Sequence, residues 1–72
     1  MTKTIEQIRE WVRTTWTCNA LLYFGDDSGR SFGAGMDRES AERITEANIP
    51  TIATNIQLWN PTSSGYWKLD IR

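Results

Sequence analysis

Apolar residues near the start of the chain recur at helical spacing, with charged residues on the opposite side. Thr4 and Gln7 have the spacing of a capping box, in which an N-cap hydroxyl and the third helical residue bond each other's backbone amides. The pattern predicts a helix over residues 5–16. Its apolar stripe consists of Ile5, Ile8, Val12 and Trp16.

A continuous apolar run follows over residues 18–24 and predicts a strand that is buried on both faces, as central strands are. The acidic and glycine-rich residues 25–29 predict a hairpin turn, because Asp and Gly tolerate the backbone conformations of tight turns. Residues 30–34 are expected to return as a short second strand in which Phe32 pairs with Tyr23.

A second helix is predicted over residues 38–47. Asp37 is a favourable N-cap residue, Asn48 suits a left-handed position at the C-terminus, and Pro50 prevents continuation. The expected inward stripe is small enough to allow close approach to a sheet. It consists of Ser40, Ala41, Ile44 and Ala47.

Strict alternation predicts two further strands, over residues 52–59 and 66–72, joined by a turn at 60–65. Pairing Trp59 with Tyr66 gathers the apolar residues of both strands on one face, whereas a slip by one residue would mix the faces. The predicted fold class is therefore α+β in the order αββαββ. We expect an antiparallel sheet of three to four strands with two helices packed on one face.

A chain of 72 residues is expected to form a single domain over residues 1–72. A domain of this size buries only about 60% of the surface of its unfolded chain. Its stability is therefore marginal, and a dimer or a partner complex would add to it. Hydrophobic residues make up 39% of the chain and include four Trp, which indicates a globular protein.

The composition excludes most catalytic chemistry. There is no His, which is the commonest general base and the commonest metal ligand. The single Cys excludes an internal disulfide framework, a zinc motif with several cysteines and a Cys–His nucleophile pair. We therefore expect no enzyme, no metal site and no cofactor. Cys18 itself is expected to be a buried structural thiol.

The charge is nearly balanced, with eight basic and nine acidic residues and a net charge of −1. This balance disfavours a protein that binds mainly phosphate backbones. Residues 26–46 contain six acidic and three basic side chains, a net −3, and the remainder contains three acidic and five basic, a net +2. No apolar run marks a signal peptide or a membrane span, so we expect a cytoplasmic protein without membrane association.

The outward face of the predicted last hairpin is the most informative candidate site. Trp59 and Tyr66 form a cross-strand pair there, with Lys68 and Arg72 along the same strand. Three interpretations stay open. In the first, the pair only stabilises the sheet, either exposed to solvent or covered by a helix on the second face of the sheet. In the second, it anchors a protein partner, since Trp, Tyr and Arg are enriched at such anchors. In the third, its rings stack on bases of single-stranded nucleic acid.

Three other features call for an interpretation. Trp11, on the rim of the first helical stripe, either closes the core or extends an apolar contact surface.

Asp26 and Asp27 lie in the predicted hairpin turn and cannot supply the roughly six to eight oxygens that a hard cation requires. As a functional group, they would form an acidic loop tip that meets a basic partner.

Residues 29–35 are rich in glycine and precede the second predicted helix, as phosphate-binding loops do. Their spacing does not fit a P-loop, and Asp37 places negative charge where an anion would bind. We therefore expect no phosphate site there.

The leading hypothesis is a small non-catalytic protein that binds a protein partner, without nucleic acid. No motif identifies a family. In size and general character the chain is similar to small proteins of phages and plasmids, among them anti-CRISPR proteins, which implies an inhibitor that blocks a host protein. The alternative is a weak single-stranded nucleic-acid binder, and a homodimer through the C-terminal edge strand is compatible with both. The predicted partner-binding residues are Trp59, Tyr66, Lys68, Arg72, Trp11, Asp26 and Asp27.

Overall fold

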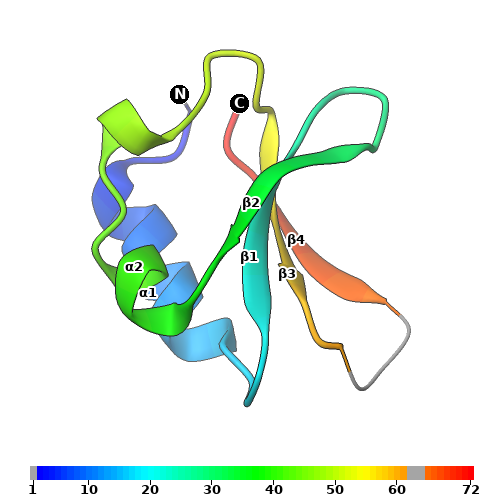
Figure 1. Ribbon diagram of the computed structural model, residues 1–72. Coiled ribbons are helices and arrows are strands. Elements are labelled where there is room, and N and C mark those ends of the chain that lie inside the picture. Colours follow the sequence, from blue (N-terminus) through cyan, green and yellow to red (C-terminus); the bar gives the residue numbers. More distant parts are fainter. Residues whose placement is uncertain (1, 62–64) are drawn as a thin grey trace.

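The computed structural model describes residues 2–61 and 65–72 (Figure 1). Its four strands form one antiparallel sheet in the order β2-β1-β3-β4, and both α-helices lie on the same face of it. The predicted α+β fold is therefore confirmed, with four strands. In chain order the elements are α1 (Ile5–Thr15), β1 (Leu21–Gly25), β2 (Ser31–Met36), α2 (Arg38–Glu42), the 3-10 helix η1 (Glu46–Asn48), β3 (Asn55–Trp59) and β4 (Tyr66–Asp70).

The start of α1 is fixed by the predicted capping box. The backbone N–H of Gln7 donates to Oγ1 of Thr4 at 3.1 Å, and the backbone N–H of Thr4 donates to Oε1 of Gln7 at 2.9 Å. Two amides that lack a partner within the helix are thus satisfied. Ile8 and Val12 are fully buried against the sheet side, so the expected apolar stripe points inward.

The hydrophobic core lies between the two helices and the inner face of the sheet. Burial of one large aliphatic side chain contributes about 1.5–3 kcal/mol, so this layer supplies most of the driving force for folding. The buried hydrophobic residues are Ile8, Val12, Ala20, Leu22, Phe24, Ala41, Ile44, Ile49, Ala53, Ile56, Leu58 and Ile71. No helix in the described part of the chain is long and apolar enough to cross a membrane.

The register of the last hairpin agrees with the prediction. Trp59 lies opposite Tyr66 and Leu58 opposite Trp67, and the ladder continues to Asn55 opposite Asp70. β1 lies between β2 and β3, so its prediction as a central strand is also confirmed. The turn predicted at 60–65 lies partly outside the described residues.

The first strand begins later than predicted, at Leu21 instead of residue 18. A turn precedes it, because the backbone N–H of Ala20 donates to the carbonyl of Thr17 at 3.2 Å and Asn19 has a φ of 65°. Asn tolerates this left-handed conformation better than most residues. The turn leaves Cys18 exposed, so the expected buried thiol is wrong.

The pairing predicted between Tyr23 and Phe32 is also wrong. Phe32 lies opposite Phe24, whereas Met36 lies opposite Leu22, so β2 carries extra residues in an irregular stretch of the ladder. Gly33 lies in this stretch with a φ of 84°. A β-bulge of this kind adds residues to one strand and carries β2 beyond residue 34 to its end at Met36.

The second helix ends at Glu42, five residues before the predicted end at residue 47. Local side-chain bonds interrupt it, because both the backbone N–H and the hydroxyl of Thr45 donate to Oδ1 of Asn48, at 3.0 and 2.8 Å. Such bonds offer the backbone an alternative to the helix. Ala47 lies beyond the helix and is exposed, Ser40 is exposed within it, and the inward stripe reduces to Ala41 and Ile44.

The third strand begins at Asn55 instead of residue 52. The backbone N–H of Ala53 donates to the carbonyl of Pro50 at 3.0 Å, which closes a turn before the strand. The turn breaks the alternation, so Ala53 is buried while Ile52 is 66% exposed.

Candidate interaction surface

The face of the sheet opposite the helices is called the helix-free face below. No helix covers it in the part of the chain that the structure describes (Figure 1), so the interpretation of Trp59 and Tyr66 as covered by a helix is wrong. The alternation of the paired strands gives its outward residues in β1, β3 and β4. They are Leu21, Tyr23, Gly25, Asn55, Gln57, Trp59, Tyr66, Lys68 and Asp70.

Trp59 and Tyr66 form the predicted aromatic pair on this face. Their ring centroids lie 4.4 Å apart at an interplanar angle of 30°. Trp59 is half-buried, whereas Tyr66 on the edge strand is 41% exposed. The pair therefore both stabilises the hairpin and presents apolar surface to the outside.

The indole of Trp59 is held in place by a series of side-chain hydrogen bonds along β3. Its Nε1 donates to Oε1 of Gln57 at 3.0 Å, and Nε2 of Gln57 donates to Oδ1 of Asn55 at 3.1 Å. Both amide residues are buried. Buried amides without such bonds would be costly, so the series fixes the orientation of the Trp59 ring.

Gly25 of β1 makes room for these amides. A Cβ atom at this position would lie 2.1 Å from Oδ1 of Asn55 and 2.3 Å from Nε2 of Gln57. Both distances are far shorter than a van der Waals contact. Glycine at the end of β1 is thus required by the close approach of the β3 side chains.

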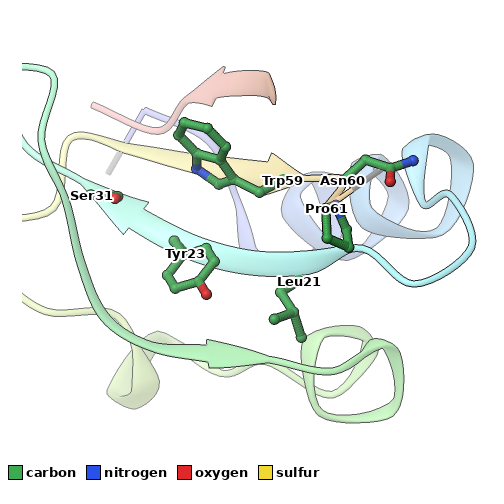
Figure 2. Close-up of a pocket in the computed structure, with 6 residues that line it drawn as sticks. All are labelled: Leu21, Tyr23, Ser31, Trp59, Asn60 and Pro61. Carbon is green, nitrogen blue, oxygen red and sulfur yellow. The ribbon is translucent and has the colours of Figure 1, made fainter. Parts of the chain in front are cut away.

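An apolar hollow of about 470 Å³ lies beside the aromatic pair. Its walls come from β1, β3, the two residues after β3 and the start of β2, and Figure 2 shows the side chains of Leu21 and Tyr23 on β1, with Trp59 on the neighbouring strand β3. Leu21 is 38% exposed and Tyr23 is half-buried. The lining residues are Leu21, Tyr23, Ser31, Trp59, Asn60 and Pro61.

Leu21 and Tyr23 are not among the predicted site residues. The run at 18–24 predicts that both residues are buried on a central strand, and this expectation is wrong because both lie at the surface of the helix-free face. Their position in the sheet identifies them, because Leu21 lies opposite Trp59 of β3 and Tyr23 lies opposite Gln57 of the same strand. Tyr23 also lies over β2, where a Cβ atom at Gly35 would come within 2.9 Å of its hydroxyl oxygen.

A second, polar hollow of about 290 Å³ gathers five of the predicted site residues at the other end of the face. These are Asp26, Asp27, Tyr66, Lys68 and Arg72, and Asp70 joins them. Nζ of Lys68 lies 3.6 Å from Oδ1 of Asp70, and the guanidinium of Arg72 donates to the carbonyl of Thr51. Both cations beside Tyr66 therefore have partners within the chain.

The carboxylate of Asp26 accepts hydrogen bonds within its own hairpin turn. Its Oδ1 accepts bonds from the hydroxyl of Ser28 at 2.6 Å, the backbone N–H of Ser28 at 2.9 Å and the backbone N–H of Arg30 at 3.2 Å. The hydroxyl bond from Ser28, followed by these backbone bonds, lowers the pKa of Asp26. The predicted hairpin turn over the acidic residues is thus confirmed. Among the described residues, no group of three or more His, Cys, Asp or Glu is arranged to hold a metal ion.

Trp11 is separate from the other predicted site residues. It is half-buried on α1, packs against the core and lines a third hollow of about 450 Å³ with Leu69 of β4. That hollow lies on the helix side of the sheet. The structure therefore does not bring Trp11 together with Trp59 and Tyr66.

Comparison with protein-family models, curated proteins and solved structures gave no match. The chemistry of these surfaces is consequently the basis for the functional assignment.

Proposed function

We propose that this protein binds a partner protein through the helix-free face and has no catalytic activity of its own. One observation carries the proposal. A rigidly oriented Trp59, its partner Tyr66 and the apolar hollow with Leu21 form a continuous apolar surface on a side of the sheet without a helix. Aromatic side chains in well-packed sites are the usual anchors of protein interfaces.

The local charges favour a protein partner over nucleic acid. Binding to a phosphate backbone depends on Lys and Arg side chains that displace counterions. Beside the aromatic pair, Lys68 is paired with Asp70, and Asp26 and Asp27 line the same hollow. Negative charge next to the stacking surface would repel phosphates, whereas it complements a basic patch on a protein.

The specific form of the proposal is an inhibitor of the kind that phages and plasmids encode against a host protein. Such a protein needs only to occupy a functional surface of its target. This form rests on the size and general character of the chain, and the helix-free face provides the surface.

A capture experiment with matched variants tests the proposal. The tagged protein is incubated with lysate of the source cells, with and without nuclease, and the captured protein is purified for affinity measurements. Leu21→Glu places a charge in the apolar hollow and is expected to weaken binding by about tenfold or more, a change of about 1.4 kcal/mol. Tyr66→Ala is expected to act in the same direction.

Ile52→Glu is the matched control, because Ile52 is the most exposed large hydrophobic residue among those the structure describes and does not line the apolar hollow. It is expected to leave the affinity unchanged. Equal affinity for wild type, Leu21→Glu and Tyr66→Ala would overturn the proposal. Capture that disappears with nuclease would instead support the nucleic-acid alternative.

A further inference from the structure

β4 is an edge strand whose outer peptide groups face away from the sheet. The backbone N–H of Ile71 donates to the carbonyl of Thr54 at 2.9 Å, so this N–H points toward the β3 side, whereas the carbonyl of Ile71 accepts from the backbone N–H of Thr2. Antiparallel strands alternate in this respect. Leu69 therefore also faces β3, and the peptide groups of Lys68 and Asp70 face the edge, where another strand can pair with them.

The side chains of β4 are arranged differently on its two faces. Trp67 and Leu69 lie on the helix side, where Trp67 is 50% exposed and Leu69 is half-buried. Lys68 and Asp70 lie next to each other on the helix-free face, two positions apart along β4, and carry opposite charges. A strand with this pattern is complementary to itself in an antiparallel arrangement.

The other edge of the sheet is less suited to pairing. β2 has an irregular register against β1, and Gly33 within it has a φ of 84°. Bulges twist an edge and interrupt the regular spacing of peptide groups. β4 is thus the better edge for a second strand.

We propose that the protein forms a homodimer in which β4 pairs antiparallel with β4 of a second copy, centred on Leu69. In this register Lys68 lies opposite Asp70 of the second copy, and Asp70 lies opposite Lys68 of the second copy. The same residues are those whose peptide groups face the edge, so each such pair also exchanges backbone hydrogen bonds. Two cross-strand ion pairs and two Leu69 side chains then meet at the twofold axis.

The charges select this register over its neighbours. Centring the pair on Lys68 would place two lysines directly opposite each other, which is destabilising. Centring it on Trp67 would move Lys68 opposite Tyr66 and form no ion pair. A shift by a single residue would place the apolar side chains of one copy on the charged face of the other.

The helix side of the proposed interface adds apolar contact. In this register Trp67 of the second copy lies opposite Ile71, the residue after β4, whose carbonyl accepts from the backbone N–H of Thr2. On the same side of the sheet, Leu69 and Lys3 line the hollow of about 450 Å³. Because each strand has only five residues, the interface is at the small end of specific ones, so the dimer forms with rising protein concentration.

Sedimentation analysis over a wide concentration range tests the proposal with two charge variants. Wild type is expected to pass from monomer to dimer. Lys68→Asp and Asp70→Lys each place like charges opposite each other and are expected to stay monomeric. The double variant Lys68→Asp/Asp70→Lys restores opposite charges and is expected to dimerise like wild type. An equimolar mixture of the two single variants is expected to form a heterodimer.

The two rescues separate an interface from a folding defect, because a variant that merely loses structure is not restored by mixing. Circular dichroism confirms that each variant is folded. Wild type that stays monomeric at the highest concentration would overturn the proposal, as would a single variant that dimerises with wild-type affinity. The inference does not rest on the proposed function, since no partner protein is present in these experiments.

Discussion

The indole N–H of Trp59 donates a hydrogen bond to Oε1 of Gln57 at 3.0 Å, and this bond sets the orientation of the largest aromatic ring on the helix-free face. Gln57 is fully buried although it lies on the side of the sheet without a helix among the described residues. An anchor that is already fixed loses little conformational entropy on binding. The series of amides on β3 therefore connects the fold to the proposed interaction.

Replacement of Gln57 by Leu should destabilise the protein. The substitution keeps a similar volume but leaves the Trp59 N–H and Oδ1 of Asn55 without their partner. Such unsatisfied groups cost about 1–3 kcal/mol of unfolding free energy, which urea denaturation measures. Trp59→Phe removes the donor, so the cost of Gln57→Leu should be smaller in that background. Strictly additive effects would contradict the coupling.

Acid should destabilise the fold through two aspartates. The hydroxyl of Ser28 lowers the pKa of Asp26, and the backbone N–H of Ser40 lowers the pKa of Asp37, each from an ordinary value of 3.8. Because the unfolded chain then binds protons first as the pH falls, this stabilisation is present above about pH 4 and is lost below it as the pH falls through the folded-state values.

Thermal unfolding from neutral to strongly acidic pH checks this expectation. Asp26→Ala should lower stability at neutral pH and weaken the loss of stability in acid. Asp27→Ala is the matched control, because it removes the same charge from the same turn and keeps the bonds from Ser28 to Asp26. The same acid dependence in wild type and Asp26→Ala would show that the Ser28 bonds contribute nothing.

Cys18 should react with thiol reagents in the folded protein. It is exposed in the turn before β1, so its modification in the absence of denaturant should be complete and stoichiometric. Cys18→Ser should change the unfolding free energy by less than about 0.5 kcal/mol, as surface substitutions usually do. Modification only after the addition of denaturant would be inconsistent with this placement.

The register of the last hairpin was predictable because alternation fixes it. Only the pairing of Trp59 with Tyr66 sorts the apolar residues of both strands onto one face, and the structure has this pairing. The start of α1 was predictable for a similar reason, since the capping box of Thr4 and Gln7 is a local signal that no distant contact changes.

The extent of the candidate surface was not predictable to the same degree. Leu21 and Tyr23 belong to an apolar run, and only the packing of both helices on the other face leaves them at a hollow. The early end of α2 depends on the side chains of Thr45 and Asn48, which compete locally with the helix. Competition of this kind is not visible in hydrophobic periodicity.

The most direct test of the proposed binding face is a nuclear magnetic resonance titration with the captured partner protein that follows the indole N–H signals. The chain has four Trp. Trp59 lies on the helix-free face, whereas Trp11 and Trp16 pack against the core on the helix side. The expected result is that the Trp59 signal shifts or broadens while those of Trp11 and Trp16 stay in place. Shifts at Trp11 and Trp16 with an unchanged Trp59 would place the partner on the opposite side and contradict the proposed binding face.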